Sequence, residues 1–194
     1  IQKAADMINW AKKPFVLVGQ GVELGNAQEE LRAFLEKGDI PCGCTLLGLS
    51  AIASSHPLNK GMLGMHGNLG PNVKTNECDV LIAVGMRFDD RVTGNLATYA
   101  KQAKIIHLDI DPSEFNKNVK VDIPVLGNCK KTLAMLTALL EEKKHTEWID
   151  SFKEYEETEN TRVIEKEVCP KTGPLNMGEV VRAVSEATQN EAIL

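Results

Sequence analysis

Two glycines follow the first predicted strand at a spacing that suits phosphate binding. Gly19-Gln20-Gly21 comes directly after the apolar residues 15–18, and Gly25 follows further on. Because glycine has no side chain, such a turn lets the backbone approach a phosphate at the start of a helix. The same spacing also suits a strand-to-helix turn without a ligand, so this turn alone leaves both interpretations open.

Three other predicted strand ends carry groups that can bind a nucleotide. They are Gly85 with Arg87 and Arg91, Asp109 with Asp111, and Gly127 with Asn128. Arginine can pair with a phosphate through two parallel hydrogen bonds, and a carboxylate at a strand end can accept hydrogen bonds from ribose hydroxyls. Together with the first turn, these groups predict a nucleotide site.

Several polar residues also have a purely structural explanation. Asp89 and Asp90 suit a solvated loop in which they cap a turn or pair with the neighbouring arginines. His107 lies in an apolar run, where a core imidazole is favoured over a catalyst, whereas His66 lies in the glycine-rich segment 61–67 and can equally face a ligand. The chain has no Ser/His/Asp set, zinc spacing or Walker loop, so no self-contained catalysis is predicted.

Composition limits the class of protein. The chain has 194 residues, a net charge of −5 and no apolar run long enough to cross a membrane, so neither nucleic acid nor a membrane is expected as a partner. Its five cysteines are an odd number in apolar surroundings without a signal peptide, which predicts free thiols and a cytoplasmic protein. Cys42 and Cys44 are expected on one buried face of a strand.

Strands and helices alternate along residues 1–140. Apolar runs predict strands at 15–18, 40–44, 79–85, 105–109 and 121–126, and helical periodicity predicts helices near 1–11, 27–37, 71–77 and 130–140. This alternation predicts a three-layer α/β fold, with a parallel sheet that carries helices on both faces and binds its ligand beyond the carboxyl ends of the strands. The glycine-rich segment 61–67 is expected to lie against another surface rather than inside the sheet.

The rest of the chain predicts a linker and the beginning of another domain. Residues 141–173 form a charged helical linker in which Trp148, Phe152 and Tyr155 share one face that docks on a domain. Residues 174–194 form the start of a truncated further domain, with a helix at 177–187 and the first residues of a strand at 191–194. Because the first residue is Ile1, the chain is expected to begin inside a larger protein.

Three motifs resemble those of the large catalytic subunit of the acetolactate synthase family. They are MLGMHG at 62–67, RFDDRVTG at 87–94 and HLDIDP at 107–112, and the resemblance covers essentially the whole chain. It implies the central, six-stranded Rossmann-like domain of a thiamine diphosphate enzyme. In that family this domain binds FAD in an extended conformation, while the two outer domains hold thiamine diphosphate and magnesium.

The resemblance also implies which residues contact FAD. Gly19 and Gly21 match the phosphate and ribitol region, and Thr45, Leu46, Leu63, Gly64, Met65, His66 and Gly67 match the flavin end. Gly85, Arg87, Asp89, Arg91 and Val92 match a second FAD stretch, Asp109 and Ile110 match the adenosine site, and Asn128 stands where the family usually has aspartate. Asn128 and the stretch 68–71 depart from the family pattern.

The implied activity belongs to the whole protein. It decarboxylates pyruvate and joins the two-carbon unit to pyruvate or 2-oxobutanoate in branched-chain amino-acid synthesis. It works as a homodimer or homotetramer, with a regulatory small subunit as a further partner. The family's catalytic glutamate and its magnesium motif belong to the outer domains, so residues 1–194 alone are expected to have no catalytic or metal-binding residues.

Three alternatives remain open on sequence. The first is the central domain of another thiamine diphosphate enzyme, such as pyruvate oxidase or glyoxylate carboligase. The second is a non-catalytic nucleotide-binding module. The third is a nicotinamide-dependent dehydrogenase, which is disfavoured because the full Gly-x-Gly-x-x-Gly motif, with an acidic residue about 20 positions later, is absent.

Overall fold

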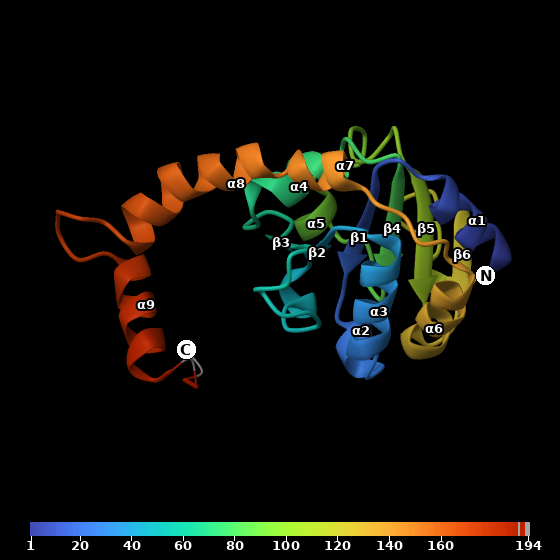
Figure 1. The fold of residues 1–194 in the computed structure, drawn as a ribbon, viewed down its shortest axis with the longest axis horizontal. Helices are drawn as coiled ribbons and strands as arrows, with labels where there is room; N and C mark the ends of the chain where they lie inside the picture. Colours follow the sequence, from blue (N-terminus) through green and yellow to red (C-terminus); the bar gives the residue numbers. More distant parts are fainter. Residues whose placement is uncertain (190, 193–194) are drawn as a thin grey trace. The chain divides into compact units, whose positions relative to one another are not determined.

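The sheet that organises residues 1–152 is entirely parallel in the computed structural model, which describes residues 1–189, 191 and 192 (Figure 1). Its strands are β1 Pro14–Val18, β2 Cys42–Cys44, β3 Asn59–Met62, β4 Val80–Val84, β5 Lys104–Asp109 and β6 Ile123–Leu126. Their order is β3-β2-β1-β4-β5-β6, so the chain builds outward from β1 in one direction and then from β4 in the other. The predicted six-stranded Rossmann-like fold is confirmed.

Alternating side chains of the central strands build two hydrophobic cores, one on each face of the sheet. In β1, Val16 and Val18 belong to one core, whereas Phe15 and Leu17 belong to the other. All five residues of β1 and all five of β4 are buried, as expected for strands covered on both faces. The continuous apolar runs in the sequence therefore have a direct structural cause.

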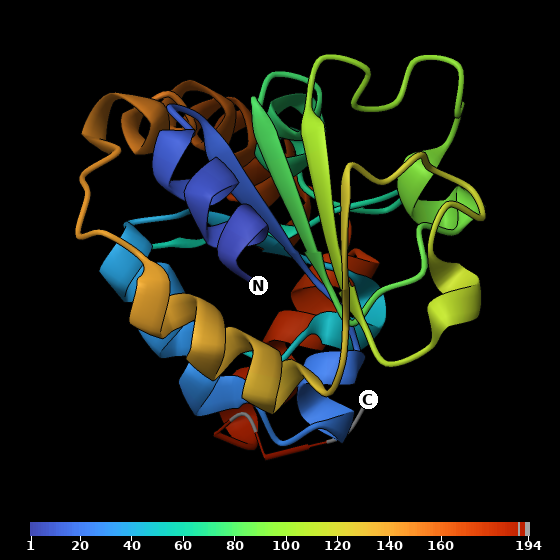
Figure 2. The ribbon, with the colours of Figure 1, turned by 90° about the vertical axis from the view of Figure 1, so that its right-hand side faces the viewer.

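Helices cover both faces. The first core is covered by α1 Gln2–Trp10, α3 Gln28–Gly38 and α6 Cys129–Leu139, and α3 and α6 lie side by side in Figure 2. On the other face α7 Thr146–Asp150 contributes Trp148 to the second core, and α4 Leu69–Thr75 contacts β3. The predicted helices on both faces are thus confirmed.

The structure adds elements that the sequence pattern did not predict. Residues 59–62 form β3, although part of this strand belongs to the glycine-rich segment. β3 is a half-buried edge strand, so it does not need large apolar side chains, and Gly61 adopts a φ of +101° beside the Asn68 side chain. Short helices α2 Gly21–Leu24 and α5 Asp90–Thr93, and the 3₁₀ turns Leu46–Gly48 and Pro112–Glu114, follow strands where loops were expected.

Two aromatic residues attach the segment 141–152 to the rest of the first unit. Trp148 is buried, and its Nε1–H donates a hydrogen bond to the carbonyl oxygen of Pro14 at 2.8 Å. Phe152 is fully buried with its ring centroid 5.6 Å from that of Phe15. The predicted docking face is therefore confirmed for these two rings, whereas Tyr155 belongs to the second unit.

The second unit, residues 153–194, is helical in its described part. It contains α8 Lys153–Glu159, a π-helical stretch Asn160–Val168 and α9 Met177–Ala187. Asn176 and Glu179 form a capping box at the start of α9, which agrees with the predicted helix. Of the strand expected at 191–194, Ile193 and Leu194 lie outside the described residues, and the division at 140 and 173 stays a prediction.

Replacement of Trp148 by leucine tests the aromatic attachment. We expect Trp148→Leu to lower the free energy of unfolding by about 2–4 kcal/mol, because a large buried ring and a hydrogen bond are both lost. Trp10→Leu is the matched control: its side chain is 67% exposed, and we expect a change within about 0.5 kcal/mol. Urea unfolding of both variants measures the difference, and equal effects would contradict the attachment.

Candidate functional site

The turns after β1 and β4 meet where the strand order reverses. The Gly21 N–H donates a hydrogen bond to the Gly85 carbonyl oxygen at 3.0 Å. A Cβ on Gly21 would lie 2.7 Å from the Gly85 Cα, and Gly85 has a φ of +59°, so only glycine fits at both positions. This reversal point is where parallel α/β sheets bind ligands.

A cavity of about 690 Å³ opens at this end of the sheet, within the size range of ligand pockets. Most of the residues predicted for cofactor binding line it: Gly21, Thr45, Leu46, Gly85, Arg87, Asp89, Arg91, Val92, Asp109, Ile110 and Asn128. The structure thus brings together groups from five separate segments of the chain.

A second cavity, of about 310 Å³, shares Arg91 and Val92 with the first. It is lined by three further predicted residues, Leu63, Gly64 and Met65. The Met65 N–H donates to the Arg91 carbonyl oxygen at 2.7 Å, so the glycine-rich segment is attached to the loop after β4. The expectation that this segment lies against another surface is confirmed for residues 63–65, whereas residues 61 and 62 belong to the sheet as part of β3.

Gly19, His66 and Gly67 line neither of these two cavities. Gly19 is buried behind the first turn, where a Cβ would collide with the Gly85 carbonyl oxygen. A Cβ on Gly67 would lie 2.6 Å from the Leu63 backbone, so this glycine permits a close turn within its own segment. His66 is exposed. Its place in the site, like that of the two glycines, remains a prediction.

Other lining residues were not singled out from the sequence. They are Gln20, Leu24, Leu47, Met86, Phe88, Glu114 and Cys129, and Gly25, which was named with the first glycine turn, lines the cavity as well. The leucines are informative because Leu24 is 75% exposed and Leu47 is 62% exposed, although both are large and apolar. The sequence does contain a signal for these two lining residues, since both leucines lie just after strand-end turns and outside the helical periodicity. Exposed apolar side chains beside a cavity suit the flat rings of a ligand.

The acidic residues after β4 have the structural roles that the sequence left open. A side-chain oxygen of Asp89 accepts from the Arg91 N–H at 3.1 Å and so caps α5, while the Arg87 guanidinium lies 3.1 Å from the same carboxylate. Arg87 is nevertheless 70% exposed and lines the cavity, so its remaining donors can reach an anionic ligand. Asp90 lines the second cavity.

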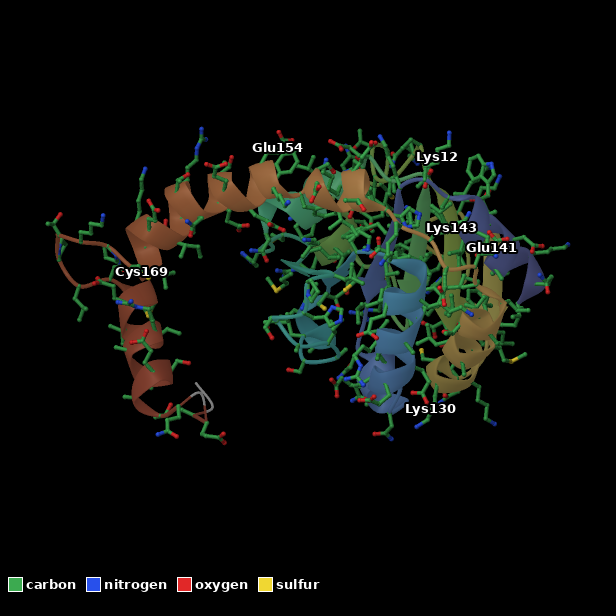
Figure 3. All side chains as sticks on the ribbon, viewed as in Figure 1. Lys12, Lys130, Glu141, Lys143, Glu154 and Cys169 are labelled. Atoms are coloured by element: carbon green, nitrogen blue, oxygen red, sulfur yellow. The ribbon has the colours of Figure 1, made fainter. Side chains whose placement is uncertain are left out.

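Asp109 and Asn128 present oxygen acceptors at the other end of the cavity. Asp109 is 13% exposed, and one of its oxygens accepts from the Asp111 N–H at 2.9 Å. Asn128 caps α6 by accepting from the N–H of Lys130, which is labelled in Figure 3, at 2.9 Å. An aspartate would serve equally as the cap, so the departure at Asn128 preserves the helix start and removes a charge.

His107 lies fully buried beside the cavity. Its Nε2 is 2.7 Å from the Met86 carbonyl oxygen and 3.6 Å from an Asp109 oxygen, and its Nδ1 has no hydrogen-bond partner among the described residues. Burial lowers the pKa of His107 below its ordinary value, although the Met86 carbonyl and the Asp109 and Glu114 carboxylates act in the opposite direction. The prediction of a core imidazole is confirmed, with one nitrogen satisfied.

All five cysteines are free thiols, as predicted. Cys42 and Cys44 are buried in the same core, which confirms their common face. Cys129 lines the cavity, and burial raises its pKa to about 11, so this thiol stays protonated at neutral pH. Within the described residues, no group of three His, Cys, Asp or Glu side chains is placed to hold a metal ion, and no helix is long and apolar enough to span a membrane.

The lining residues fit a dinucleotide better than a small polar metabolite. Glycine turns and the Arg87 side chain suit a diphosphate, the Asp109 and Asn128 oxygens suit ribose or adenine hydrogens, and exposed leucines suit flat rings. FAD contains all three kinds of group. The fold and cavity therefore define a parallel α/β domain with a cavity at the strand-order reversal that is lined by glycine turns, an arginine and oxygen acceptors.

Comparison with known proteins specifies the family. Residues 1–136 match the family described as "Thiamine pyrophosphate enzyme, central domain", and the chain belongs to this family. It is 46% identical over 153 residues to a probable acetolactate synthase large subunit of Methanocaldococcus jannaschii, covering 77% of this chain and 26% of the relative.

Two further relatives carry similar names. The chain is 44% identical over 148 residues to the acetolactate synthase isozyme 2 large subunit of Escherichia coli, covering 76% of this chain and 26% of that protein. It is 37% identical over 195 residues to the acetolactate synthase large subunit of Haemophilus influenzae, covering 99% and 34%. The chain thus spans between a quarter and a third of the length of these curated relatives.

The lowered pKa of His107 predicts a pH dependence of stability. The unfolded chain binds a proton at His107 near the ordinary pKa of 6.5, whereas the folded chain binds it only at lower pH. The free energy of unfolding should therefore decrease as the pH falls below about 6.5. Urea unfolding between pH 8 and pH 5 should show a smaller decrease for His107→Gln, and identical pH profiles would contradict the prediction.

Proposed function

We propose that the chain is the FAD-binding central domain of an acetolactate synthase large subunit. The longer protein would decarboxylate pyruvate and join the two-carbon unit to pyruvate or 2-oxobutanoate in branched-chain amino-acid synthesis. The observation that carries this proposal is one cavity lined by residues of both the RFDDRVTG and the HLDIDP motif, in a chain whose relatives are named acetolactate synthase. No residue of this chain is proposed as catalytic.

The chemistry of the lining residues assigns parts of FAD to parts of the cavity. The diphosphate would be held at the Gly21 and Gly85 turns with the Arg87 guanidinium as its cation. Asp109 would accept from ribose hydroxyls, and Asn128 would contact the adenine end without a charge. In this role FAD organises the site and undergoes no obligatory redox step.

Largely apolar side chains line the part of the cavity that we assign to the flavin. Thr45 and the exposed side chains of Leu46 and Leu47 would contact the ring, and the segment 63–67 would approach it from the second cavity. Arg91 lies between the two cavities. It would therefore lie beside the flavin end rather than the diphosphate.

The remaining features of the longer protein belong to the same proposal. Residues 141–173 would lead to a further domain that starts at 174, and the outer domains would hold thiamine diphosphate and magnesium. Assembly into homodimers or homotetramers and a cytoplasmic location follow from the resemblance to the family. A regulatory small subunit would be a further partner, which is consistent with relatives named large subunit.

A flavin titration tests the cofactor. We expect saturable quenching of FAD fluorescence by the chain, with competition by ADP and a dissociation constant about tenfold higher for Arg87→Ala, because a charge-assisted contact with phosphate is lost. Arg32→Ala is the control, since Arg32 lies on α3 and pairs with Glu29 away from the cavity. Equal affinities of the two variants would contradict the assigned diphosphate contact.

Product analysis tests the activity. The longest open reading frame that contains this sequence should be expressed with thiamine diphosphate, magnesium and FAD, and supplied with pyruvate. We expect acetolactate as the product. Acetyl phosphate, or tartronate semialdehyde from glyoxylate, would instead indicate one of the other thiamine diphosphate enzymes. Flavin binding without any of these products would indicate a nucleotide-binding module.

A further inference from the structure

The turn that follows β4 has a strained backbone at the edge of the cavity. Gly85 and Phe88 have φ values of +59° and +49°, and the second of these is costly for a residue with a bulky side chain. Met86, Arg87 and Phe88 all line the cavity. Strain of this kind persists only where surrounding contacts hold the backbone in place, so specific contacts must hold this turn.

His107 makes two of these contacts, one polar and one aromatic. Its Nε2 lies 2.7 Å from the Met86 carbonyl oxygen, and its ring meets the Phe88 ring edge to face with centroids 5.1 Å apart. On its other side the ring meets Phe115 in the same manner at 5.2 Å. His107 thus links the turn after β4 to the segment after β5, and both segments contribute to the cavity.

Only one tautomer satisfies this geometry. A carbonyl oxygen can only accept, so Nε2 must carry the proton that it donates to Met86. The Asp109 carboxylate, 3.6 Å from the same nitrogen, favours a proton there as well. Nδ1 is then an unprotonated acceptor, and it is buried without a donor. This tautomer places an N–H donor at the Met86 carbonyl oxygen and leaves Nδ1 without a hydrogen-bond partner among the described residues.

The direction of that carbonyl group determines what the turn presents to a ligand. In a trans peptide the carbonyl group of one residue and the N–H of the next point in opposite directions. The Met86 carbonyl points to the buried imidazole, so the Arg87 N–H points away from it. The Gly85 carbonyl is likewise fixed by the Gly21 N–H at 3.0 Å. Among the described residues, neither the Met86 N–H nor the Arg87 N–H has a protein acceptor.

We propose that His107 is a positioning residue that, through its Nε2–H bond to the Met86 carbonyl, holds the turn 85–88 so that its free N–H groups bind the anionic part of the ligand. This inference rests on the proposed function, because it assumes a phosphate-bearing ligand in the cavity. Free N–H groups of successive residues in a turn are a recognised anion-binding arrangement. His107 itself would not touch the ligand.

Three substitutions separate positioning from simple stability. His107→Gln keeps an N–H donor near the place of Nε2, His107→Asn keeps a donor too short to reach it, and His107→Leu has none. His145→Leu is the matched control. His145 is also buried, and its ring nitrogens lie 3.0 Å from the Gly38 and 3.4 Å from the Ala11 carbonyl oxygens, remote from the cavity lining.

The readouts are the dissociation constant for FAD and the urea midpoint of the 194-residue chain. We expect His107→Leu and His107→Asn to weaken FAD binding about tenfold and His107→Gln to stay within about threefold of the parent, which is the pattern of a lost hydrogen bond. His145→Leu should lower the midpoint and leave the dissociation constant unchanged. The proposal is overturned if His107→Asn binds FAD as tightly as the parent, or if His107→Gln binds as weakly as His107→Asn.

A measurement without ligand keeps this inference separate from the proposed function. Amide NMR spectra of the ligand-free chain should show resonance shifts for residues 85–88 in His107→Asn that are largely restored in His107→Gln. If the parent chain binds no FAD, the proposed cofactor is wrong, and these spectra still decide whether His107 holds the turn. Unchanged resonances for 85–88 in His107→Asn would refute the positioning role.

Discussion

The close approach of two backbones, at Gly21 and Gly85, is the constraint on which the rest of the site depends. The sheet extends from β1 to β2 and β3 on one side, and from β4 to β5 and β6 on the other. At the point where these two directions diverge, the turns that follow β1 and β4 lie against each other. A methyl group on either glycine would displace these turns. The cavity, its arginine and its acceptors are all positioned relative to this contact.

Beneath that contact, the cores on the two faces of the sheet differ in the kind of side chain that fills them. One face is packed almost entirely with aliphatic side chains, whereas the other contains aromatic rings around His107. Burial of this imidazole costs free energy, because its Nδ1 has no hydrogen-bond partner among the described residues. Its hydrogen bond to the Met86 carbonyl oxygen connects this core with a turn that lines the cavity.

Sequence reasoning succeeded where local pattern and environment agree. The runs around Phe15 and Leu81 predicted buried parallel strands, and the glycines and charges at their ends predicted the place of the cavity. It failed at β3, because an edge strand needs no apolar pattern. It also missed the exposed side chains of Leu24 and Leu47, although both leucines lie just after strand-end turns and outside the helical periodicity. Asp89 shows a further limit, because its cap and its ion pair coexist.

The attachment of Trp148 to Pro14 has a mechanical consequence. Pro14 is the first residue of β1, and the first glycine turn beside the cavity follows the last residue of the same strand. The attachment of Trp148 therefore lies at the opposite end of β1 from the cavity. A force applied to the chain beyond Phe152 would act on the buried rings of Trp148 and Phe152 and on the start of β1. Such a force would therefore act on the end of β1 that is remote from the glycine turns.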